Sequence, residues 1–277
     1  MPELPEAETV AREMAARTRG WKIAQVLVNY APIVASDWKS FSGLLENRTI
    51  DQVRRLGKFI VFDLSGGHNL VVHLRMTGQF HFGPFPKEKD RWPAHCHAAF
   101  RLVRSSKKEE AFFYQDTRKF GRLRAFGEGE LEPFLSSLNL GPDALTADPD
   151  DFHRRLTGTR RKLKAVLLDQ TVISGFGNIY ADETLLAARI SPLREARLLT
   201  FQETEVILAE GRRILLKAIE CRGSTVSSYQ APEGAGSYQD HHLAYGRGGK
   251  PCPFCGRNLE KIKAGGRTTV YCPGCQK

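Results

Sequence analysis

The sequence predicts an α+β protein: an N-terminal β-sandwich with flanking helices, a C-terminal helical domain and a terminal four-cysteine finger. Three observations predict this architecture. Apolar and polar residues alternate through much of 23–126, capped helical segments follow residue 148, and four cysteines lie in the last 26 residues. We therefore expect domains at 1–130, 149–242 and 243–277, with a linker at 131–148.

The composition is that of a folded globular protein, since 41% of the 277 residues are hydrophobic and 26% are charged. No run of about 18 apolar residues occurs, and the acidic start MPELPEAET lacks the basic and apolar segments of a signal peptide. We therefore expect a cytoplasmic protein. Its net charge of +10 favours a polyanionic partner, with nucleic acid first and a membrane surface second.

The N-terminal domain is predicted to begin with a helix and continue as strands. Residues 8–19 place Val10 and Met14 four positions apart and end before Gly20, which predicts a short helix. β-rich runs, separated by glycine, proline and charged residues, are predicted at 50–64, 70–82, 94–103 and 111–126. Residues 83–93 are predicted as a loop.

The C-terminal domain is predicted to be helical, after a turn-rich stretch at 128–149. Asp148 caps and Pro149 opens its first helix, and Thr200 with Glu203 forms a capping box for its longest. The helices are expected at 149–158, from 163, at about 179–188 after the SGFG turn, and at 200–221. Residues 223–243 show no periodicity, and so long a segment is usually functional or mobile.

Two CxxC pairs near the C-terminus are separated by 16 residues. Such pairs meet around one tetrahedral metal, and four thiolates leave no open position for water, so we expect one structural Zn²⁺. Disulfide pairing is the alternative, and a cytosolic chain disfavours it. The predicted ligands are Cys252, Cys255, Cys272 and Cys275.

Positive charge concentrates in two segments. Residues 243–277 carry seven Lys or Arg against Glu260, and Arg267 lies in the GGRTT turn between the cysteine pairs. Residues 153–164 carry six Lys or Arg and no acid, and the helix start that follows, with Asn178 near it, suits a phosphate. Both segments are predicted to bind phosphates. A solvated charged face is the alternative for each.

The N-terminus carries an unusual amine. Removal of Met1, which a small following residue favours, leaves Pro2 as a free secondary amine followed by Glu3 and Glu6. An α-amine has a pKa of about 8, so a fraction of the molecules carry the neutral, nucleophilic amine at neutral pH. Attack on a sugar C1′ would give an iminium that acidifies the C2′ proton, with Glu3 shuttling protons. An inert acidic tail is the alternative.

Two β runs end in glycine turns, at HLRMTG (73–78) and DTRKFG (116–121). Such turns would project Met76, Arg118 and Phe120 outward, as apolar and arginine wedges project in proteins that flip bases. Burial of Met76 and Phe120 in the core is the alternative.

Residues 95–97 are His-Cys-His. Alternation along a strand puts His95 and His97 on one face. A metal site there lacks further ligands in the sequence, so phosphate contact or strand packing is the favoured interpretation. Cys96 and Cys221 are predicted to be buried small apolar residues.

Together these features resemble the bacterial formamidopyrimidine-DNA glycosylase family (Fpg, or MutM). The resemblance covers essentially the whole chain in order, and its combination of motifs is highly specific. The motifs are MPELPE at 1–6, LGKF at 56–59, HLRMTG at 73–78, DTRKFG at 116–121, LLDQ at 167–170, GFGNIYADE at 175–183, YGRGGKPCPFCG at 245–256 and GGRTTVYCPGCQK at 265–277.

The resemblance implies a helix-two-turn-helix motif in the helical domain and a bifunctional DNA glycosylase and abasic-site (AP) lyase of base excision repair. The implied substrates are oxidised purines, 8-oxoguanine and formamidopyrimidines, released through an N-terminal proline Schiff base with β,δ-elimination. The sister Nei group prefers oxidised pyrimidines and begins PEGPE, so Leu4 favours the Fpg side. Lesion preference is expected in the loop 223–243, where this sequence departs most from the family pattern.

By position, the resemblance also implies residue roles. Pro2 would be the nucleophile, Glu3 the acid/base, Lys58 the proton donor of β-elimination and Arg267 the phosphate-gripping donor for δ-elimination, with Glu6 in the catalytic region. The implied DNA-binding residues are His73, His95, Arg118, Arg160, Lys164 and Asn178. Met76, Arg118 and Phe120 would fill the void in the duplex.

A non-enzymatic zinc-ribbon module that binds DNA is the alternative function. It explains the charge and the cysteines but not the amine and carboxylate at the N-terminus. Sequencing the N-terminus of the mature protein distinguishes the two, since a retained Met1 would favour the binding module. We expect double-stranded damaged DNA as the partner, no membrane partner, and a monomer.

Overall fold

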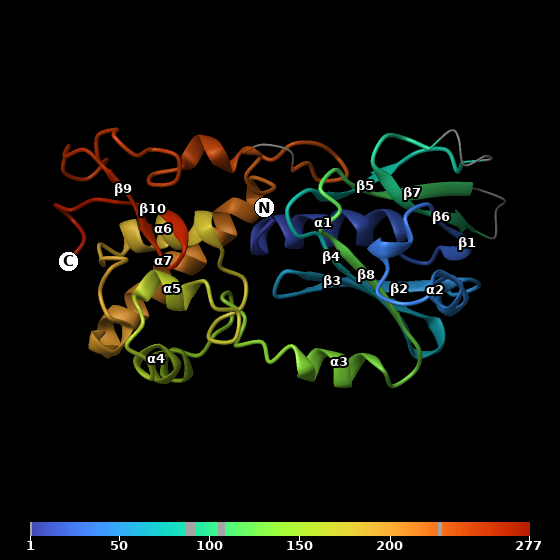
Figure 1. The fold of residues 1–277 in the computed structure, drawn as a ribbon, viewed down its shortest axis with the longest axis horizontal. Helices are drawn as coiled ribbons and strands as arrows, with labels where there is room; N and C mark the ends of the chain where they lie inside the picture. Colours follow the sequence, from blue (N-terminus) through green and yellow to red (C-terminus); the bar gives the residue numbers. More distant parts are fainter. Residues whose placement is uncertain (1, 87–91, 105–108, 227–228) are drawn as a thin grey trace. The chain divides into compact units, whose positions relative to one another are not determined.

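The computed structural model describes residues 2–86, 92–104, 109–226 and 229–277 (Figure 1). They divide into an N-terminal unit, Met1–Ser137 with Ser224–Gly236, and a C-terminal unit, Leu138–Gly223 with Ser237–Lys277. The chain therefore returns to the N-terminal unit through 224–236. No helix among these described residues is both long and apolar enough to cross a membrane.

Two four-stranded antiparallel sheets build the N-terminal unit (Figure 1). One sheet has the strand order β1-β6-β7-β5 and the other β2-β3-β4-β8. The strands are β1 Lys22–Val28, β2 Ile50–Leu56, β3 Phe59–Leu64, β4 His68–His73, β5 Gly78–Phe82, β6 Cys96–Val103, β7 Glu109–Asp116 and β8 Arg122–Phe126. The chain thus changes sheet between β1 and β2, between β4 and β5, and between β7 and β8.

One apolar core joins the two sheets, which confirms the predicted sandwich. Phe62 of β3 stacks on Phe112 of β7 with ring centroids 6.0 Å apart, and Phe80 of β5 meets Phe62 edge-on. Helices α1 (Leu4–Thr18) and α2 (Trp38–Leu45) bury apolar side chains in the same core. Short helical turns, Ala31–Ile33 and Ser65–Gly67, complete the unit with α3 (Leu131–Ser137).

The structure differs from the sequence prediction at several element boundaries. The run predicted at 50–64 is the hairpin β2–β3, because Gly57 has a φ of 55° and turns the chain. Helix α2 was not predicted, although the Asp37 side chain caps it by accepting backbone N–H bonds at 3.0 Å. Helix α3 lies inside the predicted linker.

Four helices build the C-terminal unit, as predicted. They are α4 Pro149–Thr157, α5 Leu163–Leu167, α6 Asn178–Ala187 and α7 Phe201–Glu220, with short turns at Ala196–Leu198 and Tyr238–His241. Asp148 caps α4 by accepting the N–H groups of residues 150 and 151, and Thr200 forms the capping box of α7 with Glu203. A Cβ at Gly211 of α7 would lie 2.7 Å from the Phe176 ring, so glycine there lets the turn before α6 pack on α7.

A hairpin of β9 (Glu260–Ala264) and β10 (Arg267–Tyr271) forms the finger. Gly265 and Gly266 join the strands with φ values of 57° and 72°, which a two-residue turn of this type requires. The hairpin packs on α6 through the cluster of Leu186, Leu259 and Val270. The finger is therefore part of the C-terminal unit.

Candidate active site and nucleic-acid interface

The N-terminus is built into the fold. Pro2 is buried and Glu3 is 1% exposed, and Glu3 is the N-cap of α1. The Glu6 carboxylate, also 1% exposed, accepts the backbone N–H of Glu3 at 2.8 Å. Pro5 lies in the first turn, where its missing N–H costs nothing. The helix therefore starts four residues earlier than predicted, and the described start of the chain is part of the fold and not a tail.

The Glu6 carboxylate also holds the segment 224–236. Its second oxygen accepts the N–H of Ser224 at 2.7 Å, and the Tyr229 hydroxyl donates to the Glu6 carbonyl at 3.3 Å. Tyr229 is 4% exposed and belongs to the core of the N-terminal unit. Part of the loop predicted at 223–243 is therefore fixed beside the first turn of α1.

Lys58 follows Gly57 in the β2–β3 turn and is half-buried. Arg55 holds this turn to α1, because its guanidinium donates to the Gly57 carbonyl at 3.0 Å and to the Glu8 carboxylate at 2.8 Å. Burial alone would raise the pKa of Glu8, but hydrogen bonds from Arg55 and Arg12 lower that pKa below its ordinary value. Arg55 and Glu8, which had no predicted role, thus tie the Lys58 turn to the helix that carries Glu3.

His73 ends β4 as a neutral side chain. Burial, with the positive charges of Arg75 and Lys58, lowers the pKa of His73 to about 3. Its Nδ1 accepts the N–H of Arg75 at 3.0 Å, which leaves the ring hydrogen on Nε2. His73 can therefore meet a phosphate as a neutral donor.

Met76, Arg118 and Phe120, which we call the turn cluster, come together in the N-terminal unit. The Arg118 Nη1 donates to the Met76 sulfur at 3.0 Å, and the guanidinium carbon lies 4.8 Å from the centroid of the Phe120 ring. Phe120 is 49% exposed and Met76 is half-buried. The core alternative is thus excluded for Phe120.

His95 and His97 do not share a strand face, so that prediction is wrong. β6 begins at Cys96, and His95 precedes it in a turn with a φ of 63° and an exposed side chain. His97 is buried, with its Nε2 2.8 Å from the Asp116 carbonyl oxygen. Cys96 is buried as predicted, and burial raises the pKa of its thiol to about 11, whereas Cys221 is half-buried.

Gln170 fixes the turn before α6. Its Nε2 donates to the Phe176 carbonyl at 2.9 Å, and its Oε1 accepts the Gly175 N–H at 3.0 Å. Asn178 begins α6, and its buried Oδ1 makes no hydrogen bond within the described part of the chain. Gln170 had no predicted role, and its place in the LLDQ motif was the one signal available.

Lys164 does not face solvent, so the prediction that it contacts DNA phosphate is wrong. It is fully buried, and its ammonium donates to the Asp182 carboxylate at 2.6 Å and to the Thr268 carbonyl at 3.1 Å. The other Asp182 oxygen accepts the Val270 N–H at 3.1 Å. Lys164 and Asp182 therefore hold strand β10 of the finger to α5 and α6.

Glu183, next to Asp182 on α6, holds the segment that enters the finger. It is 1% exposed and accepts the N–H groups of Leu243, Ala244 and Tyr245 at 2.8, 3.0 and 2.8 Å. Burial raises the pKa of Glu183 above its ordinary value. Neither Asp182 nor Glu183 had a predicted role, although two adjacent carboxylates in a largely apolar helix segment were the available signal.

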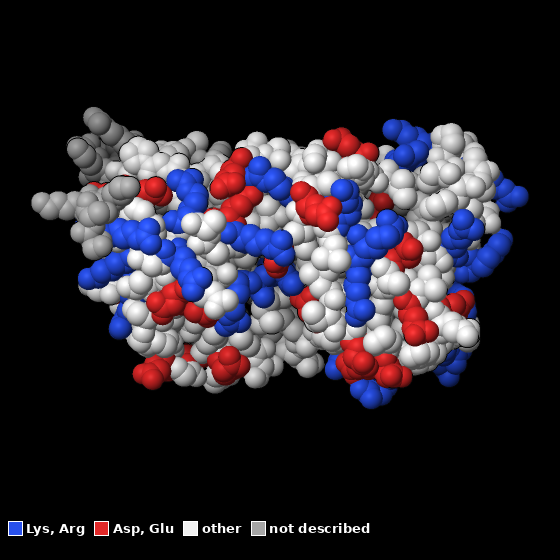
Figure 2. All heavy atoms as spheres, turned by 180° about the vertical axis from the view of Figure 1, so that it is seen from behind, with Lys and Arg blue, Asp and Glu red and all other residues white. Residues whose placement is uncertain are grey.

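Four of the six cations in the basic run at 153–164 form ion pairs in the structure. Arg154 and Arg155 pair with Asp151, and Arg161 pairs with Asp169 at 2.8 Å. Arg160 is exposed. Figure 2 shows blue and red side chains interspersed over the face seen from behind, so charge on that face does not single out a phosphate-binding stripe.

Arg267 is exposed as the first residue of β10, beside the hairpin turn. A Cβ at Gly265 of this turn would lie 3.0 Å from the Ala165 side chain, so the hairpin tip lies directly against α5. Arg267 is therefore an exposed cation beside a turn that packs against α5.

The four cysteines predicted as ligands meet as one cluster, with all four sulfurs within 4.8 Å of one another. The Sγ atoms of Cys252 and Cys275 are 3.9 Å apart, and those of Cys255 and Cys272 are 3.5 Å apart. Tetrahedral zinc with bonds of about 2.3 Å places sulfurs roughly 3.8 Å apart. The residues therefore fit one structural Zn²⁺.

Removing the zinc is expected to lower DNA affinity while leaving the N-terminal unit folded. A strong chelator removes binding energy of about 10–16 kcal/mol that stabilises the finger, and Cys272→Ser weakens the site by removing one of its four ligands. The ligands all lie in the C-terminal unit. Amide exchange of each unit and duplex titration measure the two effects. Cys221→Ser, outside the cluster, is the matched control. A chelated protein with full duplex affinity would contradict this expectation.

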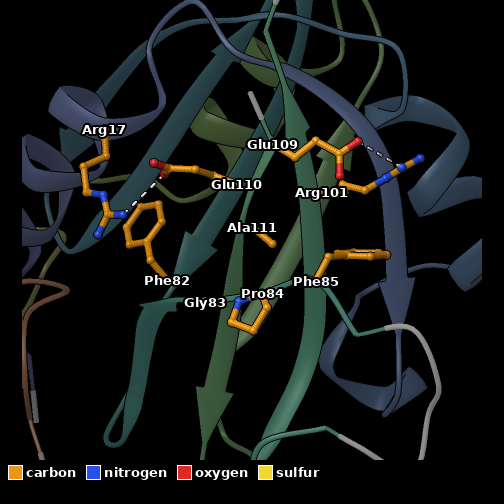
Figure 3. Close-up of a pocket in the computed structure, with 9 residues that line it drawn as sticks. All are labelled: Arg17, Phe82, Gly83, Pro84, Phe85, Arg101, Glu109, Glu110 and Ala111. Atoms are coloured by element: carbon orange, nitrogen blue, oxygen red, sulfur yellow. Dashed lines mark hydrogen bonds and ion pairs between the residues drawn. The ribbon is translucent and has the colours of Figure 1, made fainter. Parts of the chain in front are cut away.

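The N-terminal unit also contains a groove of about 580 Å³ lined by residues from α1 and strands β5, β6 and β7 (Figure 3). Its cations are paired: Arg17 contacts Glu110 at 3.3 Å, and Arg101 contacts Glu109 at 3.7 Å. Arg17 also lies over the Phe82 ring, 3.5 Å from its centroid. None of the predicted site residues lines this groove, so it is not the site that the sequence indicates.

Three family models match successive parts of the chain: the formamidopyrimidine-DNA glycosylase N-terminal domain at residues 1–123, the helix-two-turn-helix domain of the same glycosylase at 139–230, and a zinc finger found in that glycosylase and in IleRS at 249–277. Among curated proteins, the chain is 42% identical to the formamidopyrimidine-DNA glycosylase of Thermus thermophilus and 35% identical to that of Lactococcus lactis. Both matches cover 100% of this chain, and 98% and 100% of the relatives.

Solved structures agree with this similarity. A complex of the Lactococcus lactis Fpg with DNA that contains an abasic site matches at a TM-score of 0.91 and 32% identity, with 100% of both chains covered. The same values hold for a mutant of that enzyme in complex with DNA that contains Fapy-dG. The fold and the zinc finger, with this similarity, define a DNA-repair glycosylase of the helix-two-turn-helix class. The chain belongs to the formamidopyrimidine-DNA glycosylase family.

Proposed function

We propose that this glycosylase is bifunctional: it removes oxidised purines, 8-oxoguanine and formamidopyrimidines, from double-stranded DNA and then cleaves the abasic strand. The observation that carries the proposal is the buried Pro2–Glu3 pair at the start of α1 in a chain of this family. The abasic-site and Fapy-dG complexes of the Lactococcus lactis relative support the substrate class.

The proposed chemistry begins at Pro2, after Met1 is removed. Burial favours the neutral form of an amine, which is the nucleophile. The Pro2 nitrogen attacks C1′, the bond from C1′ to the base breaks, and the base leaves with a proton. Loss of the amine proton leaves C1′ bonded to both the Pro2 nitrogen and O4′. Cleavage of the C1′–O4′ bond, with a proton taken up by O4′, then opens the sugar ring and gives the iminium. The iminium accepts the electrons of the C2′–H bond as Glu3 takes that proton.

Elimination completes the reaction. Loss of the C2′ proton expels the 3′ phosphate, with Lys58 supplying a proton, and a second elimination expels the 5′ phosphate held by Arg267. Water then releases the sugar fragment from Pro2. We assign phosphate contacts to His73, His95, Arg118, Arg160 and Asn178, and insertion into the duplex to Met76, Arg118 and Phe120.

The test of this function is a covalent trap. Borohydride added during turnover of a lesion duplex is expected to link the protein to DNA at Pro2, because an iminium is reducible, whereas attack by an activated water leaves no such adduct. Peptide mapping by mass spectrometry locates the linkage. A trapped lysine in the wild-type protein would overturn the assignment of Pro2, and a cleaved duplex without any adduct would overturn the Schiff base.

Salt titration separates phosphate contacts from insertion. Arg267→Ala is expected to reduce the slope of log affinity against log salt by about 0.9, with affinity lost on intact and damaged duplexes alike. Phe120→Ala, matched to it, should leave the slope unchanged and weaken damaged-duplex binding selectively, because only an unstacked duplex accepts the ring. Equal slopes for Arg267→Ala and the wild type would remove Arg267 from the phosphate contacts.

A further inference from the structure

The two turns that carry the turn cluster lie side by side. The first, between β4 and β5, bears Met76, and the second, between β7 and β8, bears Arg118 and Phe120. Gly78 of β5 pairs with Asp116 of β7 in one sheet, and β4 pairs with β8 in the other. Both turns therefore pass from one sheet to the other at the same end of the sandwich.

One buried carboxylate links these turns. Asp116 is 0% exposed, and its Oδ2 accepts the Gly121 N–H at 2.7 Å, which closes the second turn. Its Oδ1 accepts the hydroxyl hydrogen of Thr77 from the first turn. The same oxygen accepts the Arg118 N–H at 3.2 Å.

Thr77 of the first turn also accepts a hydrogen bond from the second turn. Its Oγ1 accepts the Arg118 N–H at 3.1 Å while donating to Asp116. A hydroxyl has one hydrogen to donate and lone pairs to accept with, so Thr77 uses both capacities. Arg118 is thus held at both ends by the first turn: its backbone by Thr77 and its guanidinium by Met76.

The packing beneath the turns leaves no room for a side chain at Gly78 or Gly121. A Cβ at Gly78 would lie 2.2 Å from the Tyr114 hydroxyl, and a Cβ at Gly121 would lie 1.7 Å from it. Tyr114 is fully buried, and its hydroxyl makes no hydrogen bond within the described ranges. Tyr114 therefore supplies contact, whereas the polar link between the turns runs through Asp116 and Thr77.

We propose that Asp116 and Thr77 are positioning residues that hold the turns of Met76 and of Arg118–Phe120 as one preorganised wedge. This inference rests on the proposed insertion of the turn cluster into DNA. Side chains ordered before binding lose less conformational entropy when they enter the duplex. A wedge of two independent turns would meet that entropic cost at each encounter.

The test uses Thr77→Val, which keeps the shape of the side chain and removes the hydroxyl. We expect its affinity for a duplex with a tetrahydrofuran abasic analogue to fall about tenfold, the effect of losing a hydrogen bond to a charged group. The fluorescence rise of 2-aminopurine beside the analogue, which reports unstacking, should fall at saturating protein, with the salt slope unchanged. Thr77→Ser and Tyr114→Phe, which keep the link, should behave as the wild type.

Combination with Phe120→Ala separates positioning from loss of stability. If Thr77 acts through the wedge, the double variant Thr77→Val/Phe120→Ala should bind the abasic-analogue duplex almost as tightly as Phe120→Ala alone. If Thr77→Val instead lowers affinity through a general loss of folding, the losses of the two single variants should add in full. Asp116→Asn, which retains one acceptor oxygen, repeats the test from the other partner. Additive losses, or a Thr77→Val fluorescence signal equal to that of Thr77→Ser, would overturn the proposal.

The same measurements distinguish failure of the proposed function. If Phe120→Ala gives the wild-type fluorescence signal and affinity, insertion of the turn cluster is wrong. If Phe120→Ala abolishes the signal and Thr77→Val does not, insertion stands and the positioning role of Thr77 and Asp116 falls.

Discussion

Glu3→Gln is expected to lower the rate of base excision by about 10²–10⁴-fold, which is the range that general acid–base catalysis contributes. Glutamine keeps the size of the side chain but neither accepts nor delivers the proton. The backbone N–H of Glu3, which Glu6 accepts at 2.8 Å, is unchanged by the substitution, so the start of α1 should persist. Single-turnover excision from a lesion duplex measures the loss.

Binding provides the control for this variant. Affinity for an abasic-analogue duplex should be retained, because the proposed phosphate contacts belong to other side chains. Glu13→Gln, on the same helix, keeps an oxygen for the Glu233 N–H, which Glu13 accepts at 3.0 Å, and should retain full excision. If Glu3→Gln lost excision and binding equally, Glu3 would be a structural residue and the acid/base assignment would fall.

Local signals in the sequence predicted much of the fold. Asp148, Pro149 and the Thr200–Glu203 box act within one helical turn, so the helices they begin were predicted close to their observed starts. The start of α1 was missed because its cap is the Glu6 side chain, on residues that read as an acidic tail. The division of strands between the two sheets was also missed. The run predicted at 70–82 is two strands, β4 and β5, which belong to different sheets. A chain that crosses between sheets near Thr77 has the same alternation of apolar and polar residues as one long strand.

Sequence patterns identify residue types at the site but not which cations are exposed. The run at 153–164 contains no acid, yet Asp151, Asp169 and Asp182 reach it from outside the run. Lys164 therefore looked like a phosphate ligand, although it is buried in an ion pair formed by tertiary packing. Phe120 is the reverse case, since its type favours the core while its turn exposes it.

Lys164→Ala is expected to lower the free energy of unfolding of the C-terminal unit by about 3–5 kcal/mol, because it leaves the Asp182 carboxylate buried without its cation. Replacing the pair by Lys164→Met with Asp182→Asn should restore part of that stability, since the amide needs no counter-charge and keeps an oxygen for the Val270 N–H. Arg160→Ala, on an exposed neighbour, should change stability by no more than about 0.5 kcal/mol. Denaturant unfolding of the three variants makes the comparison.

The loss in Lys164→Ala should also depend on pH. Burial already raises the pKa of Asp182 to about 6, from an ordinary value of 3.8, and removal of Lys164 raises it further. The folded variant then binds a proton that the unfolded chain releases above about 4, so its stability falls as pH rises through that window. The deficit in stability relative to the wild type should thus be smaller at pH 5 than at pH 8.

DNA binding tests the assignment of Lys164 separately. Under conditions where the variant is folded, the slope of its log DNA affinity against log salt should equal that of the wild type. A folded Lys164→Ala protein whose slope fell by about 0.9 would instead make Lys164 a phosphate contact.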